Sequence, residues 1–221
     1  MLLVCPPTPC LRQVWSRITA DSCPQDYNFH LHTLASDGQL HPHQVIDQAL
    51  ALGMKGLAIT DHHSVQGYFA AQAYLSSHPQ ADLILWTGIE INAWLENTEV
   101  HILGYGFEPT HTALQPFLRS AQGQAPDATP DATVVTKALH AAGGLVVLAH
   151  PYRYNRPGDH LIMAAAAVGM DGIEAYYNYK NPDPWYPSPE QTTSALKLAA
   201  HLGLYTTCGT DSHGTNITRR I

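Results

Sequence analysis

Positive charge and cysteine are both scarce in this chain of 221 residues. Eleven Lys and Arg stand against 18 Asp and Glu, giving a formal net charge of −7 with neutral histidine. This balance disfavours sequence-independent attraction to duplex DNA. Four irregularly spaced cysteines are too few to form a disulfide scaffold for a chain of this size. No apolar run reaches the roughly 18 residues of a membrane-spanning helix, and the first residues lack the segments of a secretion signal, so we expect a cytoplasmic protein.

Histidine, by contrast, is abundant, with 14 residues against 11 Lys and Arg together. The chain is 45% hydrophobic and 13% charged, a composition that excludes disorder. Its length fits one domain. We expect residues 1–25, which are rich in proline, to form an N-terminal arm with a short helix around 11–18, and residues 26–221 to form the domain.

From Tyr27 onward, short apolar runs alternate with helical patterns. Seven strands are predicted, at 27–32, 56–60, 83–92, 100–106, 144–150, 172–177 and 204–210. Helices are predicted between them, at 42–52, 65–77, 112–121, 132–142, 161–168 and 192–202. A polar turn at Glu96–Thr98 indicates a hairpin between the third and fourth strands. The alternation is typical of an α/β fold with a largely parallel sheet, either a distorted barrel or a doubly wound open sheet.

Six of the seven predicted strands deliver a His, Asp or Glu to one rim, and the C-terminal strand ends are where α/β barrels carry their chemistry. His30 and His32 are two residues apart on a strand, so they point to the same face. The other candidates are Asp37, His62, Glu90, His101, His150, Asp211 and His213. Any one alone would be explained as a hydrogen-bonded core residue. Burying nine ionisable groups together without counterions is very costly, and divalent metals remove that cost, so the pattern predicts a multinuclear metal site.

The ordered segments HLHT, SDG, TDHH, GIE, AHP and GTDSH resemble the motifs of the PHP (polymerase and histidinol phosphatase) superfamily. The resemblance runs from about Tyr27 to the end of the chain. It implies a distorted (β/α)7 barrel that holds two or three metals. It assigns the first metal to His30, His32, Glu90 and Asp211, the second to Glu90, His101 and His150, and the third to Asp37, His62 and His213.

Three divalent ions and three carboxylates would leave such a trinuclear site with a charge of about +3, which suits a dianionic phosphate. Paired metals acidify a bridging water and stabilise the leaving oxygen. The predicted reaction is therefore metal-dependent hydrolysis of a phosphate ester by a metal-activated hydroxide, with Glu90 and Asp211 essential for turnover. A ligand set of nitrogen and oxygen atoms without cysteine favours Mn, Zn or Fe over Mg or Ca.

Residues around the rim leave alternatives open. His63 either donates a proton to the leaving group or is an ordinary solvent-facing histidine. Arg153 and Arg156 either bind a phosphate or are simply solvated. Tyr176 and Lys180, in the loop 176–187, are further candidate substrate contacts, and this loop either stacks a nucleobase or covers the rim.

Two carboxylates beside the predicted ligands have secondary roles in this interpretation. Asp61, which lies beside His62, is expected to orient a ligand imidazole. Glu174 ends the sixth strand and can line the site, but it is not a standard metal ligand of the family.

Within the resemblance, the arginines and the aromatic loop favour enzymes that act on nucleotides such as 3′,5′-bisphosphates or on short 5′-phosphorylated RNA. The alternatives are a histidinol-phosphate-type phosphatase, a metallo-amidohydrolase and a noncatalytic metal-stabilised scaffold for a partner protein. The expected partner is a small phosphorylated metabolite, a nucleotide or a short RNA, rather than duplex DNA or a membrane.

Overall fold

The structure, a computed structural model, describes residues 7–120 and 123–221. Its helices are α1 (Pro7–Trp15), α2 (Pro42–Leu52), α3 (Gln66–Ser76), α4 (Ala132–Ala141), α5 (Gly158–Ala167) and α6 (Pro189–Leu202), with 3₁₀ helices η1 (Thr112–Phe117) and η2 (Pro151–Arg153). Its strands are β1 (Tyr27–Asn28), β2 (Gly56–Ala58), β3 (Ile84–Trp86), β4 (Gly88–Leu95), β5 (Thr98–Tyr105), β6 (Leu145–Leu148), β7 (Gly172–Tyr176) and β8 (Tyr205–Cys208).

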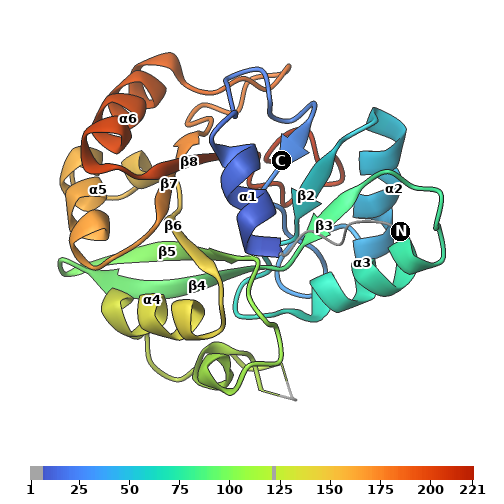
Figure 1. The fold of residues 1–221 in the computed structure, drawn as a ribbon, viewed down its shortest axis with the longest axis horizontal. Coiled ribbons are helices and arrows are strands. Elements are labelled where there is room, and N and C mark those ends of the chain that lie inside the picture. Colours follow the sequence, from blue (N-terminus) through green and yellow to red (C-terminus); the bar gives the residue numbers. More distant parts are fainter. Residues whose placement is uncertain (1–6, 121–122) are drawn as a thin grey trace.

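The strands form two sheets with helices on their outer sides (Figure 1). The first sheet has the order β1-β2-β3 and is parallel. The second has the order β4-β5-β6-β7-β8, and β5 runs antiparallel to both of its neighbours. Helices α2 and α3 lie beside the first sheet, and α4, α5 and α6 lie beside the second.

Single bridges connect the two sheets, Leu31 with Ser212 and His62 with Glu90. The predicted mixed α/β fold is confirmed. The described segments do not form one continuous closed sheet, so the closed seven-stranded barrel stays a prediction.

The strand predicted over 83–92 is wrong as a single element, because the chain passes from one sheet to the other at Thr87. The Thr87 hydroxyl donates to the Phe107 carbonyl at 2.9 Å. A Cβ at Gly88 would lie 2.4 Å from the Ile59 carbonyl oxygen, so only glycine permits this close approach of two backbones. The eighth strand results from this crossing.

Local signals account for the elements that match their predictions. Pro42 occupies the first turn of α2 and Gly53 ends it with φ +69°, a conformation that suits glycine. Glu96 and Asn97 have positive φ angles at the tip of the predicted β4–β5 hairpin, as a tight hairpin turn requires. Of the helix predicted over 112–121, a 3₁₀ helix at Thr112–Phe117 is present, and position 121 lies outside the described residues.

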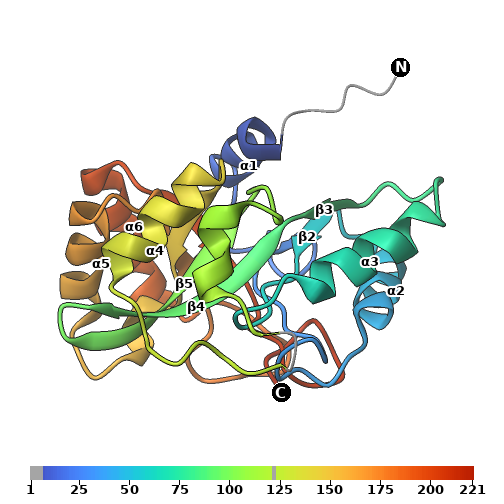
Figure 2. The ribbon, with the colours of Figure 1, turned by 90° about the horizontal axis from the view of Figure 1, so that it is seen from below.

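Helix α1, earlier in the chain than the helix predicted around 11–18, caps one end of the molecule (Figure 2). The C-terminus lies on the opposite side. Leu11 and Trp15 of α1 are buried in the larger hydrophobic core, with the Trp15 ring 5.3 Å from that of Tyr105. Within the described ranges, no helix is long and apolar enough to cross a membrane.

Candidate metal centre

The candidate metal centre lies where the segments that follow β1, β2 and β8 come together beside β4. His30 and His32 come directly after β1, and backbone hydrogen bonds tie them to the segment after β8. The Asp211 N–H donates to the His30 carbonyl at 2.9 Å, and the His32 N–H donates to the Ser212 carbonyl at 3.0 Å. Pairing between the ends of the chain therefore brings these ligands together.

Four buried side chains form the first group, with their donor atoms all within 4.8 Å of one another: His30, His32, Glu90 and Asp211. Glu90 Oε2 lies 3.1 Å from His30 Nε2 and 3.0 Å from His32 Nε2. Asp211 Oδ1 lies 3.3 Å from His32 Nε2. This is the set that the resemblance assigned to the first metal.

A second group is more open to solvent and contains Asp37, His62 and His213 together with His32. Asp37 Oδ2 lies 3.3 Å from His213 Nε2 and 3.9 Å from His62 Nε2. The set expected around a third metal is thus brought together, with His32 shared between this group and the first.

The remaining predicted ligands, His101 and His150, both approach the other oxygen of Glu90. Glu90 Oε1 lies 2.7 Å from His101 Nδ1 and 3.6 Å from His150 Nε2. His62, Glu90 and His101 form one tight group, whereas His150 groups with His30 and Glu174. All nine predicted ligands therefore lie in overlapping groups around Glu90, and their division among individual metals stays a prediction.

The chemistry of these residues fits divalent metal ions. His150 is buried, yet neither of its ring nitrogens has a hydrogen-bond partner among the residues that the structure describes. Buried polar atoms are normally paired, so an orphaned imidazole beside a carboxylate points to a ligand between them. Imidazole and carboxylate donors together suit Mn, Zn or Fe.

Burial and charge separate the pKa values of these groups. Burial disfavours the charged forms of His62 and His150 and lowers their pKa values to about 4 and about 3. Burial by itself raises the pKa of Glu90, but the charges of His30 and His101 hold it well below its usual range. At neutral pH Glu90 is therefore ionised, and the imidazoles of His62 and His150 are neutral. These are the forms of the side chains that bind metals.

Asp211 is held by three donors on one of its oxygens. Its Oδ2 accepts from Arg153 Nη1 at 2.8 Å, from the Tyr177 hydroxyl at 2.8 Å and from Arg220 Nε at 2.9 Å. Its Oδ1 faces His32. Two guanidinium groups therefore lie at the edge of the ligand cluster. One belongs to Arg153, whose contact with a phosphate stays a prediction.

Glu174 has a larger role than the sequence indicated. It is buried, its Oε1 lies 3.0 Å from His30 Nδ1, and its Oε2 accepts from the His150 N–H at 2.9 Å. A carboxylate in this position orients the ligand imidazole so that the other nitrogen, Nε2, faces Glu90. The sequence contains a signal for this position of Glu174, because Glu90 and Glu174 both end a Gly-Ile-Glu segment.

Tyr176 was predicted to contact substrate, but the structure places it away from the centre. Its hydroxyl donates to the Ile18 carbonyl at 3.3 Å, whereas Tyr177 reaches Asp211. The register of β7 against β8 shifts between Glu174 and Tyr176, so the alternation that would put these two side chains on one face is interrupted. Tyr177 and Arg220 are the residues that sequence reasoning missed, and neither carries a local signal.

Arg156 and Lys180, also predicted to contact substrate, lie outside the ligand groups. Arg156 Nε donates to Thr98 Oγ1 at 3.0 Å, beside the β4–β5 hairpin. Lys180 is exposed on the loop after β7, where its main-chain N–H donates to Asn178 Oδ1 at 2.6 Å.

His63 and Asp61 flank the ligand His62, and both bond to other parts of the chain. His63 Nδ1 donates to the Phe117 carbonyl at 2.8 Å, and burial lowers the pKa of its imidazole. Asp61 accepts from the Thr33 N–H at 2.7 Å and from the Thr33 and Ser36 hydroxyls at 2.8 Å and 2.7 Å. Asp61 thus secures the loop that carries Asp37. The orientation of a ligand imidazole by Asp61 stays a prediction.

A family model described as the PHP domain matches residues 28–183, and the chain belongs to this family. A 5′-3′ exoribonuclease of Haemophilus influenzae is 26% identical across 67% of this chain and 78% of its own length. A 3′,5′-nucleoside bisphosphate phosphatase of Chromobacterium violaceum is 36% identical across 42% of this chain. That match covers only 32% of the phosphatase, so the chain spans about a third of that relative.

Two solved structures share the fold. A protein assigned as a metal-dependent phosphoesterase from Bifidobacterium adolescentis superposes with a TM-score of 0.70 and 24% identity, covering 89% of this chain and 93% of that one. An amidohydrolase from Chromobacterium violaceum with bound sulfate superposes with a TM-score of 0.71 and 22% identity, covering 86% and 88%. The family and its relatives confirm the predicted reaction class, metal-dependent hydrolysis of phosphate esters.

Proposed function

We propose that this chain hydrolyses phosphate esters of nucleotides, with a 3′,5′-bisphosphate or the 5′ end of a short RNA as substrate. The observation that carries the proposal is the ligand cluster around Glu90 with the guanidinium groups of Arg153 and Arg220 at its edge. Arginine pairs with phosphate in a planar, bidentate way that amide substrates do not need. The names of the Haemophilus and Chromobacterium relatives support the nucleotide class.

Two or three ions of Mn, Zn or Fe would be held by the nine ligands: the first by His30, His32, Glu90 and Asp211, the second by Glu90, His101 and His150, and the third by Asp37, His62 and His213. When bound, such ions would acidify a water molecule near neutral pH and polarise the phosphoryl group. We include Glu90 and Asp211 in the catalytic centre because each touches both of the first two histidines.

The chain's own residues would orient the substrate. Arg153 is 33% exposed at its side chain, so its guanidinium can contact a phosphate oxygen while Tyr177 and Arg220 keep Asp211 in position. Proton donation by His63 has less support, since the Phe117 carbonyl engages its Nδ1 and the Asn92 N–H lies 3.4 Å from its Nε2.

We also propose that the two bridged sheets form a distorted (β/α)7 barrel. Residues 26–221 would be the phosphoesterase domain and residues 1–25 its N-terminal arm. A cytoplasmic location remains our expectation.

The test is phosphate release by protein stripped of metal and reloaded with Mn²⁺. The substrates are adenosine 3′,5′-bisphosphate, a 5′-phosphorylated short RNA, histidinol phosphate and an aryl phosphate. We expect metal-dependent release that is fastest with the bisphosphate or the RNA. Preference for histidinol phosphate would overturn the substrate assignment, and inactivity on all four with metals bound would favour amide substrates or a scaffold role.

A further inference from the structure

An open groove of about 680 Å³ lies between the tip of the β4–β5 hairpin and the segment after η2. Its lining includes Trp94, Glu99, Arg153, Tyr154 and Arg156. The volume falls within the roughly 300–1,000 Å³ of small-molecule sites. Arg153 lines this groove and also bonds to Asp211, so the groove lies next to the metal centre.

The hairpin presents the groove and the metal ligands on the same face. Alternate residues of a strand share a face, so Trp94 of β4 lies on the side that carries Glu90. Trp94 pairs directly with Glu99 of β5, two residues before the ligand His101. Three residues of β4 lie between Glu90 and Trp94, so about 14 Å of strand separates their Cα atoms. Trp94 therefore lies further out along the hairpin than the ligand cluster.

Trp94 is far more exposed to solvent than the other three tryptophans of the chain, and the structure describes all four. It is 45% exposed, whereas Trp15, Trp86 and Trp185 are 2%, 3% and 8% exposed. An indole left open beside a site provides a flat surface on which an aromatic ring can stack.

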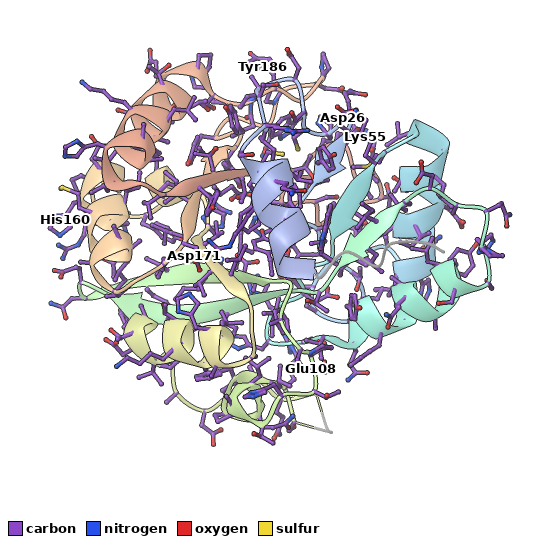
Figure 3. All side chains as sticks on the ribbon, viewed as in Figure 1. Asp26, Lys55, Glu108, His160, Asp171 and Tyr186 are labelled. Carbon is purple, nitrogen blue, oxygen red and sulfur yellow. The ribbon has the colours of Figure 1, made fainter. Side chains whose placement is uncertain are left out.

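Two arginines give the groove a preference for a ring attached to an anionic group. Arg156 is held by Thr98 Oγ1 at 3.0 Å and by His160 Nε2 at 3.3 Å. Arg153 reaches from the groove to Asp211. His160 lies at the edge of the molecule that bears this groove (Figure 3).

The aromatic loop 176–187 is a poorer platform than the sequence suggested. Tyr176, Tyr177 and Trp185 are all buried, and Tyr186 is the large aromatic of this loop that is well exposed, at 54%. Figure 3 shows Tyr186 at a different edge of the molecule from His160, so it is remote from the groove.

We propose that this groove binds the nucleobase of the substrate, and that Trp94 stacks on it beside Arg156. The assignment rests on the proposed nucleotide phosphoesterase function and names the residues that would select nucleotides over simple phosphate esters. Trp94 and Arg156 are specificity residues here, and the ligand cluster performs the reaction.

The kinetic test compares kcat/KM for adenosine 3′,5′-bisphosphate with kcat/KM for glycerol phosphate, which has no ring. In Trp94→Ala the ratio should fall about tenfold or more, in the range that alanine substitution of base-stacking aromatics produces. Trp94→Phe should restore most of the ratio, and Tyr186→Ala, the matched control, should leave it unchanged. An unchanged ratio in Trp94→Ala would show that the groove does not bind the nucleobase. A fall in Tyr186→Ala alone would show that the nucleobase stacks on the loop 176–187 instead.

A binding test separates this inference from the reaction itself. Trp94 should dominate the tryptophan fluorescence that iodide quenches, since the other three indoles are buried, and that quenchable fraction should vanish in Trp94→Phe. Adenosine 5′-monophosphate, but not glycerol phosphate, should protect Trp94 from iodide in the metal-loaded protein. Protection in a protein that hydrolyses no phosphate ester would support the groove and overturn the proposed function. Hydrolysis without any protection would overturn the groove and leave the function standing.

Discussion

Phe29 and His30 are neighbours in the chain, yet their side chains lie in two regions with opposite physical chemistry. Phe29 lies in an aromatic cluster, where its ring centroid is 6.0 Å from that of Trp15, 5.4 Å from Trp86 and 6.1 Å from Tyr105. His30 lies among carboxylates, with its Nε2 3.1 Å from Glu90. Two consecutive residues just after β1 therefore contribute to different regions, Phe29 to the hydrophobic core and His30 to a buried ionisable cluster.

The two regions gain their stability from different sources. The aromatic cluster removes apolar surface from water and needs nothing from outside the chain. The ligand cluster buries carboxylates and imidazoles, which is unfavourable until metal ions satisfy them. Stability and activity should consequently respond to separate substitutions, and the following experiments test that separation.

The largest effect is expected from the ligand cluster. Glu90→Ala and Asp211→Ala should each lower kcat about 10³-fold or more, because several kcal/mol of transition-state stabilisation depends on bound metal. The loss of kcat is measured as the rate of phosphate release in the presence of Mn²⁺. Glu108→Ala, which removes an exposed carboxylate elsewhere, is the control and should behave as wild type. Full activity in either cluster variant would contradict the assignment.

The aromatic cluster should show the reverse behaviour. Trp15→Ala should lower the free energy of unfolding by about 3–5 kcal/mol, as deletion of a large buried aromatic does, with kcat of the folded protein retained. Denaturant unfolding and phosphate release below the melting temperature measure the two quantities. Trp15→Phe is a milder control, since the indole N–H has no partner among the described residues. A large loss of kcat in Trp15→Ala without loss of stability would show that the two regions are not separate.

Metal removal should affect stability only through the ligand cluster. Mn²⁺ at about 100 times its Kd stabilises the folded state by about 2.7 kcal/mol, or about 5–10 °C in Tm for a chain of this size. Chelation should remove this increment in wild type and in Trp15→Ala. Glu90→Ala and Asp211→Ala should show a much smaller shift, and an equal shift in all four proteins would place the metals elsewhere.

The smallest effect should come from the carboxylate that orients His30. Glu174→Gln keeps the size of the side chain but loses the charge near His30 Nδ1, so the affinity for Mn²⁺ should fall about 10–100-fold. Titration of the metal-free protein with Mn²⁺ measures this Kd directly. Glu108→Gln serves as the matched control. An unchanged Kd for Mn²⁺ in Glu174→Gln would show that the Glu174 carboxylate does not contribute to metal binding.

Local signals predicted part of this architecture well. The helix predicted over about 42–52 matches α2, because Pro42 marks its first turn. The break at Thr87 was not predicted, since the strand-like pattern from 83 to 92 gives no sign of a change of sheet and only the approach of the Ile59 backbone requires Gly88. A pattern along the chain reports burial, but it does not report which sheet buries the residue.

The positions of His, Asp and Glu along the chain were enough to predict the candidate metal ligands, because residues at the ends of the strands reach one rim. The residues that support these candidates follow only from how distant segments pack. The shift of β7 against β8 turned Tyr177, and not Tyr176, toward Asp211. The distant Arg220 reached the same carboxylate. Register and phase are set by pairing between segments far apart in the chain, and no local pattern carries that information.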